Sequence, residues 1–364
     1  MIFASVKEEN KDGEKKHGLL MSYEEEWVRL YYFLEQRGYR LRRRYHPEWV
    51  PSWILKPVQS GSIFNEDAIQ SVPKVVDAER IETGAKVMLK MVNLSSEELL
   101  ISSYVSSPPR PDDPRNHCVR LLDVILIPAC ETHAIMVMPL LYEHSVLPFR
   151  RAGELIELAN QLTECLEFLH EHKIAHRDYC RRNVLVDPKK LIISPIHPFD
   201  PLTPPDGTLF DFKWVGSRWA VRPNQYSVID FGYSKTFEQR EDALTAGIVG
   251  QDDSVPEMSL TVPYNPFPVD VYHLGNMLLS FCDVSAVYPS CNSRDTYDPC
   301  LGIFSKWGYG EAEISGSEND TGRSNASAHS SRGYGSNLPS QSQDLLLRPS
   351  TTNLDIRSPV PPHF

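Results

Sequence analysis

The chain has 364 residues, of which 41% are hydrophobic and 23% are charged, a composition typical of globular proteins. Its formal net charge of -11 argues against a general nucleic-acid binder, which would be basic. The seven cysteines form no CxxC pair, so the sequence indicates neither a zinc site nor a disulfide framework. Since we also find no signal peptide or long apolar run, we expect a cytoplasmic or nuclear protein with no membrane contact.

The first predicted helix follows a charged N-terminus, residues 1–21, which we expect to be disordered. Between Ser22 and Arg37 apolar residues recur at helical spacing, with Ser22 as a possible N-cap and Gly38 where the helix would end. The loop RRRYHPEWVPSW comes next. Its three arginines could bind phosphate, although pairing with acids or solvent is our preferred interpretation. We treat residues 22–73 as an N-terminal helix and extension.

Residues 74–92 predict a β-hairpin whose turn contains Gly84. The segment SSEELLISSYVSS predicts a short helix capped by Ser95 or Ser96, and VRLLDVILIP and HAIMVMPLL predict two more strands. A long amphipathic helix, GELIELANQLTECLEFLHEH, follows, and then short strands at 183–187 and 226–230. Because strands come first and helices mostly later, we predict an α+β fold with a small β-rich lobe and a larger α-rich lobe.

The strongest chemical signal is IAHRDYCRRNVLVD, a loop that follows the long helix. Phosphoryl transfer from ATP needs positioned Mg²⁺ and a carboxylate that orients the acceptor hydroxyl and takes its proton. Asp178 suits that catalytic role, and Asn183, five residues later, suits a metal ligand. Arg177 is a further catalytic candidate, since such an arginine can pair with a phosphate in the following segment. The alternative is a surface turn that only matches the motif.

Two further motifs favour the same chemistry. YSVIDFG places Asp230 at the end of a strand, where it could hold Mg²⁺. Lys90, in the β-rich run KVMLKMV, could contact the α- and β-phosphates, with Lys86 as its rival for that role. In the helix that follows, we prefer Glu98 over Glu97 as the partner that holds Lys90.

Downstream residues suggest how the segment after Asp230 is held and controlled. Asp270, in PVDVYHLGNML, is predicted to brace the backbone of the catalytic loop, with an N-cap as the alternative. We expect Arg177 to pair with a phosphate, or else with Glu241 or Asp242. The candidate acceptors are Ser234, Thr236, Thr245 and Ser254, of which the central Thr245 is our first choice.

With these motifs, the chain resembles the eukaryotic protein-kinase superfamily from Lys74 to about Cys282. More narrowly, RGYRLRRRYHPEWVPSW, VVDAERIETGAKVMLK, DDPRNHCVRLLDV, IHPF and NPFPVDVYHLGNML resemble kinase-like proteins of mushroom-forming (basidiomycete) fungi. The resemblance implies a bilobal protein-kinase-like fold over residues 74–292, with the N-lobe ending at about 141, and it implies ATP and Mg²⁺. It also places adenine beside VMPLL, with Met138 behind the base and with Pro139 and Leu141 offering backbone groups.

The sequence departs from the kinase pattern in four places. No GxGxxG precedes Lys90, and Cys180 stands where serine/threonine kinases usually carry lysine. An aromatic-rich insertion, residues 188–223, is expected to pack on the large lobe. The helices that normally follow PVDVYHLGNML are missing, so we expect a truncated C-lobe followed by a disordered, serine-rich tail, residues 293–364.

We therefore predict a protein kinase that transfers the ATP γ-phosphoryl group to a Ser, Thr or Tyr hydroxyl of a protein substrate that the sequence does not identify. The first alternative is a pseudokinase that acts as a scaffold or allosteric module, favoured by the missing glycine loop. The second is a small-molecule kinase of the aminoglycoside type, which the Asp270 motif and the segment Val255-Pro256-Glu257, similar to the APE motif of protein kinases, disfavour.

Overall fold

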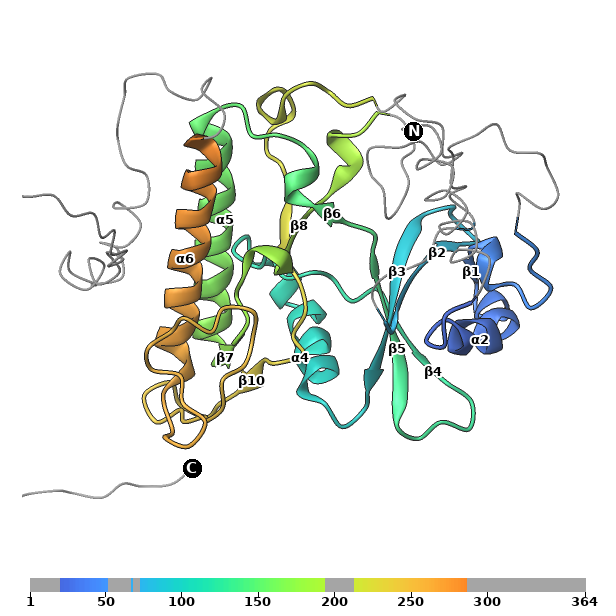
Figure 1. Cartoon of the computed structure of the whole chain (residues 1–364), viewed down its shortest axis with the longest axis horizontal. Coiled ribbons are helices and arrows are strands. Elements are labelled where there is room, and N and C mark those ends of the chain that lie inside the picture. Colours follow the sequence, from blue (N-terminus) through green and yellow to red (C-terminus); the bar gives the residue numbers. More distant parts are fainter. Residues whose placement is uncertain (1–19, 52–66, 68–72, 194–212, 287–364) are drawn as a thin grey trace, which may run out of the picture. The chain divides into compact units, whose positions relative to one another are not determined.

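The N-terminal lobe is built on a five-stranded antiparallel sheet (Figure 1). The computed structural model describes residues 20–51, 67, 73–193 and 213–286, all within one compact unit, residues 1–310. The strands, in the order β1-β2-β3-β5-β4, are β1 (Tyr39–Leu41), β2 (Val75–Arg80), β3 (Lys86–Asn93), β4 (Asp123–Leu126) and β5 (His133–Pro139). The predicted hairpin is confirmed as β2 and β3, and Gly84 in its turn has φ 70°, which glycine adopts without steric cost.

Helix α2 (Glu25–Gln36) covers one face of this sheet. The predicted N-cap at Ser22 is wrong, because residues 22–24 form a turn and Glu24 occupies the cap position. The buried side chains of this core come from one side of α2 and from alternate strand residues: Trp27, Leu30, Tyr31, Leu34, Val76, Ala78, Val87 and Leu89. Since side chains alternate along a strand, Lys90 lies on the opposite face of β3 from Leu89.

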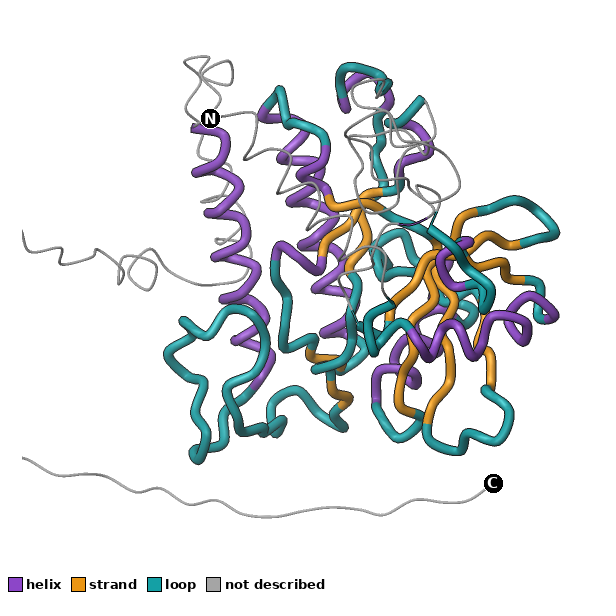
Figure 2. The backbone as a smooth tube through the Cα atoms, turned by 45° about the vertical axis from the view of Figure 1, so that its right-hand side comes forward, coloured by secondary structure: helices purple, strands orange, loops and turns teal. Residues whose placement is uncertain are grey.

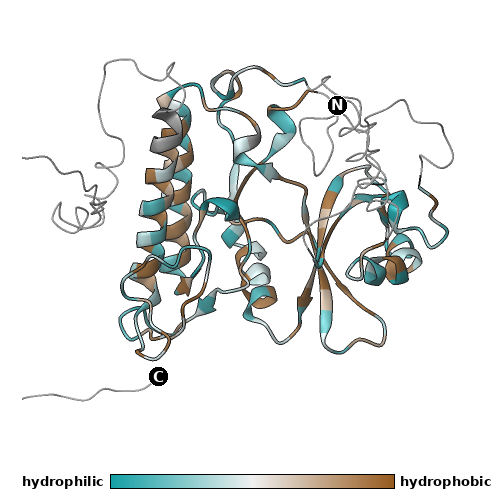
Figure 3. Cartoon of the chain, viewed as in Figure 1, coloured by the Kyte–Doolittle hydropathy of each residue, from teal (hydrophilic) through white to brown (hydrophobic). Residues whose placement is uncertain are grey.

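The C-terminal lobe is built around two long helices, α5 (Ala152–Glu171) and α6 (Pro266–Ala286), which run side by side (Figure 1). Their facing residues join one core cluster, which includes Leu158, Leu162, Leu166, Leu274 and Phe281. In Figure 3, apolar residues colour much of α5 and of the N-lobe strands brown. Hydrophobic burial therefore supports both lobes.

Short strands lie between the lobes and carry the loops of interest. A three-stranded sheet contains β6 (Tyr142–Glu143), β8 (Val184–Val186) and β9 (Tyr226–Val228), and β7 (Ile174–Ala175) pairs with β10 (Lys235–Thr236). Helix α4 (Glu97–Ser106) follows β3. Figure 2 shows most strands on one side and the two long helices on the other. The predicted bilobal α+β fold is thus confirmed.

Residues 217–221 of the predicted insertion pack on α5. Short 3-10 helices occur at Pro188–Lys190 and Arg218–Val221. The Trp219 N–H and the Ser217 hydroxyl donate to the buried Glu154 carboxylate at 2.9 and 3.2 Å. The middle of the insertion, residues 194–212, lies outside the described residues.

Several predictions concern parts of the chain that the structure does not describe. The predicted N-terminal disorder falls almost entirely on such residues, and the serine-rich tail does so completely. The predicted C-lobe truncation also concerns residues after α6, so it stays a prediction. Among the described helices, none combines the length and apolar character needed to cross a membrane.

Candidate active site

Lys90 lies on β3, and two carboxylates hold its ammonium group. Its Nζ donates to Glu98 at 2.5 Å and to Asp230 at 2.8 Å. Glu98 lies in the first turn of α4, and Asp230 follows β9. The structure therefore places Glu98, and not Glu97, on the lysine. The rival Lys86 is largely exposed and pairs with Glu79 at 2.8 Å.

Lys90 and Asp230 each stabilise the charged form of the other. Burial by itself would lower the pKa of Lys90, but the carboxylates of Glu98 and Asp230 raise it above its usual value. Burial would raise the pKa of Asp230, yet the Lys90 ammonium and hydrogen bonds leave it below its usual value. Both groups are therefore charged at neutral pH.

Asp270 fixes the backbone of the loop that precedes Asp178. Its fully buried carboxylate accepts the N–H groups of His176 and Arg177 at 2.7 and 2.6 Å, and it also contacts His170 Nε2 at 3.1 Å. Arg177 has φ 66°, a left-handed conformation that is costly for residues other than glycine, so these bonds hold a strained turn. Asp270 lies in the second turn of α6, which excludes the N-cap alternative.

Asp178 and Asn183 are in direct contact, and both are buried. The Asn183 amide nitrogen donates to the Asp178 carboxylate at 2.9 Å and to the Asp178 backbone carbonyl at 2.8 Å. The Asn183 backbone carbonyl accepts the N–H of Ile229, the residue before Asp230, at 2.9 Å. The two predicted loops are therefore tied together at their bases.

Gln251 also contacts Asp178, and the sequence analysis did not identify it. Its backbone N–H donates to one carboxylate oxygen at 2.8 Å and its side-chain amide to the other at 3.3 Å. Gly250 allows this approach, because a Cβ there would lie 2.8 Å from the Arg177 carbonyl oxygen. The glycine was the only available signal, since 73 residues separate Gln251 from Asp178.

The donor set around Asp230 fits a magnesium ion that is bound together with a nucleotide. The described residues contain no group of three or more His, Cys, Asp or Glu that could hold a metal alone. Proteins usually bind Mg²⁺ through one or two carboxylates plus substrate phosphates. Asp230 uses only one of its oxygens in hydrogen bonds to described residues, and the amide oxygen of Asn183 makes none there.

The predicted adenine contacts lie at the end of β5. Met138 and Leu141 are partly buried beside the C-lobe core. The Leu140 N–H donates to the Lys86 carbonyl at 3.3 Å. Because the Pro139 carbonyl belongs to the same planar peptide, it points away from β3. The roles of Met138, Pro139 and Leu141 stay predictions.

The segment after Asp230 differs from expectation at Thr245. This residue is 7% exposed and exchanges backbone hydrogen bonds with Tyr264 at 2.9 and 2.8 Å, so it is not an accessible phosphate acceptor here. Ser234 is also buried, whereas Thr236 and Ser254 are exposed. Arg177 donates to the Tyr233 carbonyl at 3.1 Å, and within the described ranges it pairs with neither Glu241 nor Asp242.

The arginines after β1 are mostly acid-paired, as we preferred. Arg42 pairs with Asp77 and Arg44 with Glu24, each at 2.7 Å. These pairs lie at the start of the connection from β1 to β2. That connection precedes Lys90 and carries no GxGxxG.

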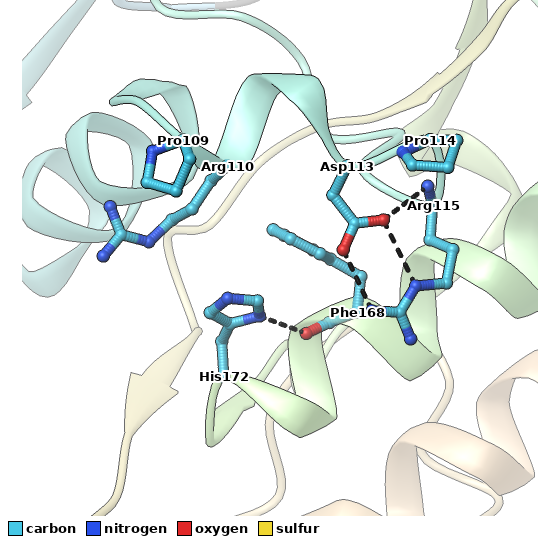
Figure 4. Close-up of a pocket in the computed structure, with 7 residues that line it drawn as sticks. All are labelled: Pro109, Arg110, Asp113, Pro114, Arg115, Phe168 and His172. Carbon is cyan, nitrogen blue, oxygen red and sulfur yellow. Dashed lines mark hydrogen bonds and ion pairs between the residues drawn. The ribbon is translucent and has the colours of Figure 1, made fainter.

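A cavity of about 480 Å³ lies elsewhere, near the end of α5 (Figure 4). It is lined by Pro109, Arg110, Asp113, Pro114, Arg115, Phe168 and His172. Figure 4 shows the Asp113 carboxylate bonded to Arg115, and His172 bonded to the Phe168 carbonyl. None of its lining residues is among the predicted site residues.

Comparisons with known proteins agree with this geometry. Residues 79–196 match the family model described as protein tyrosine and serine/threonine kinase. This segment contains Lys90, Asp178 and Asn183 and stops before Asp230. Over 132 residues the chain is 28% identical to "Serine/threonine-protein kinase AFC1" of Arabidopsis thaliana. The matched stretch covers 36% of this chain and 26% of that protein. The chain thus spans about a quarter of the curated relative. The chain is thus similar to protein kinases over about a third of its length, in the segment that carries Lys90, Asp178 and Asn183.

Proposed function

We propose that this protein is a kinase that transfers the γ-phosphoryl group of ATP to a Ser, Thr or Tyr hydroxyl of a protein. One observation carries the proposal: Lys90 Nζ lies 2.5 Å from Glu98 and 2.8 Å from Asp230. These two contacts join β3 to α4 and to the segment that follows β9. Kinase activity requires this lysine–glutamate pair and the metal-binding aspartate to be in place together. The narrower resemblance to basidiomycete kinase-like proteins belongs to the same proposal and rests on sequence motifs alone.

Each residue has a defined role in the proposed reaction. Lys90 would bind the α- and β-phosphates, and Asp230 and Asn183 would hold Mg²⁺, which would supply charge neutralisation to the phosphates. Asp178 orients the acceptor hydroxyl and takes its proton while the hydroxyl oxygen bonds to the γ-phosphorus and the bond to ADP breaks. Arg177 supports the loop that presents Asp178.

The base-binding end of the site is also part of the proposal. Adenine would lie against the end of β5, with Met138 behind it. The Pro139 carbonyl and the Leu141 N–H would bond to the base. The outward direction of the Pro139 carbonyl supports this arrangement.

A pseudokinase is the second candidate, and the β1–β2 connection favours it. In kinases a glycine-rich loop at this point covers the phosphates. Here the chain carries no GxGxxG, and its arginines Arg42 and Arg44 are bonded to Asp77 and Glu24. A protein built in this way could bind a partner without transferring phosphate.

The substitution Asp178→Asn tests the proposal, because it keeps the shape of the side chain and removes its negative charge. We expect label transfer from γ-labelled ATP to a generic protein acceptor to fall by about 10² to 10⁴-fold, with nucleotide binding retained. Asp253→Asn, which alters an exposed carboxylate in the neighbouring segment, is the matched control and should transfer label normally.

Two outcomes would contradict the proposal in different ways. Equal labelling by wild type and Asp178→Asn at matched nucleotide occupancy would reject Asp178 as the base. Nucleotide binding by the wild type without any labelling, across a panel of Ser-, Thr- and Tyr-containing acceptors, would favour the pseudokinase.

A further inference from the structure

Helix α4 is joined to the segment after Asp230 by a contact beside the Lys90 group. One carboxylate oxygen of Glu97 accepts the Thr236 N–H at 2.8 Å and the Thr236 hydroxyl at 3.0 Å. Glu97 directly precedes Glu98, which bonds to Lys90. Two adjacent carboxylates therefore connect the same helical turn to β10 and to β3, and Figure 1 shows β10 beside α4.

The contact continues from β10 to the catalytic loop. Thr236 pairs with Ile174, and Lys235 pairs with Ala175. Strand β7 leads directly into His176, whose N–H is held by Asp270. A short series of fixed backbone contacts thus links Glu97 to the loop that carries Asp178.

The first turn of α4 depends on these polar contacts. The hydrophobic anchors of the helix, Ile101 and Val105, lie farther along it, and Leu100 is 67% exposed. Ser96 precedes the helix but makes no capping bond, since its hydroxyl donates to the Asn93 carbonyl instead. Apolar burial therefore contributes little to fixing the position of the turn that carries Glu98.

We infer that Glu97 and Thr236 form a latch that positions α4, so that Glu98 stays in contact with Lys90. Glu97 and Thr236 are positioning residues, because they act through the ion pair and not on the reacting atoms. The catalytic meaning of the latch rests on the proposed function, whereas the latch itself can be measured without activity.

Thr236→Val is the most specific variant, because it removes the hydroxyl and leaves the backbone N–H in place. A change at Glu97 would be less clear, since an acid in the first turn also interacts favourably with the helix dipole. Thr236→Ser retains the hydroxyl and is the matched control. Leu100→Ala, an exposed change on the same helix, controls for general perturbation of α4.

The measurement is the rate at which Lys90 is acylated by an N-hydroxysuccinimide ester in the full chain without nucleotide. Mass spectrometry reports Lys90 and, as an internal reference, the exposed Lys86. We expect Thr236→Val to raise Lys90 acylation about 3- to 10-fold, since a typical intramolecular hydrogen bond contributes about that factor to a local opening equilibrium, and this bond is exposed to solvent. Amide exchange in residues 97–101 should rise in parallel, and Thr236→Ser should match the wild type.

Three results would overturn the latch: wild-type acylation in Thr236→Val, an equal rise in Thr236→Ser, or a rise in Leu100→Ala. None of these readouts needs phosphoryl transfer. A protein that responds as expected but never labels an acceptor contradicts only the proposed function. A protein that transfers phosphate but gives any of these three results contradicts only the latch.

Discussion

Two ion-pair groups of the N-lobe differ in how far water reaches them. Arg44 and Glu24 form a bidentate pair whose side chains are 0% and 1% exposed. Lys90 and Asp230, in the other group, are 20% and 45% exposed. The Arg44 pair lies beside α2, while Lys90 lies on the face of β3 away from the α2 core.

The difference in exposure distinguishes a structural ion pair from the proposed nucleotide site. Charges removed from water are tolerated only when their hydrogen bonds are satisfied, and Arg44 also donates to the Asp67 carbonyl at 3.0 Å. Such a pair cannot exchange a partner for a ligand. The Lys90 group can exchange a partner, because water, phosphate or a metal ion can reach the exposed side of Asp230.

Breaking the buried pair should have the largest effect on stability. We expect Arg44→Ala to lower the free energy of unfolding by about 3–5 kcal/mol, because it leaves the Glu24 carboxylate buried without its cation. Arg29→Ala removes the exposed pair with Glu26 and should cost about 0–1 kcal/mol. Urea unfolding gives the free energy of unfolding of both variants. Similar losses of free energy in the two variants would contradict the idea that burial makes the Arg44 pair structural.

His144 extends the comparison, because it is buried in its neutral form, whereas Arg44 is buried as part of an ion pair. Burial lowers the pKa of His144 from 6.5 to about 4. The folded state therefore binds this proton less readily than the unfolded chain, so the stability that His144 contributes is present above pH 6.5 and is lost as the pH falls toward 4. The loss is on the order of 3 kcal/mol. His144→Gln should flatten the dependence of unfolding free energy on pH in this range, and an unchanged dependence in this variant would contradict the role of His144.

Removing the partly buried cation Lys90 should have the smallest effect on stability and a clear effect on binding. We expect Lys90→Met to lower the free energy of unfolding by about 1–2 kcal/mol, less than Arg44→Ala, because water reaches Asp230 although Glu98 is left buried without its cation. Nucleotide affinity should fall about tenfold or more, because losing a hydrogen bond to a charged group reduces binding by about that factor. Lys86→Met is the control in a thermal-shift titration with ATP and Mg²⁺, and an equal loss of affinity there would refute the assignment of Lys90.

Local sequence was sufficient for much of the fold and for part of the site. Two β-rich runs joined by a turn with Gly84 predicted β2 and β3, because strand pairing across a short turn depends on neighbouring residues. Asp178 and Asn183 are only five residues apart, so a single loop brings them together. Asp230 could be placed because it directly follows a short apolar strand.

Tertiary structure decided the contacts that join distant segments. Adjacent helical residues point about 100° apart, and only the packing of α4 determines that Glu98 faces Lys90 while Glu97 faces Thr236. Tertiary packing also produces three further features: the bond from Gln251 to Asp178, the burial of Thr245 and the pairing of Glu24 with Arg44. Sequence alone determined which residues could carry the chemistry. The folded chain determined which of them meet, because those contacts depend on long-range packing that no local pattern records.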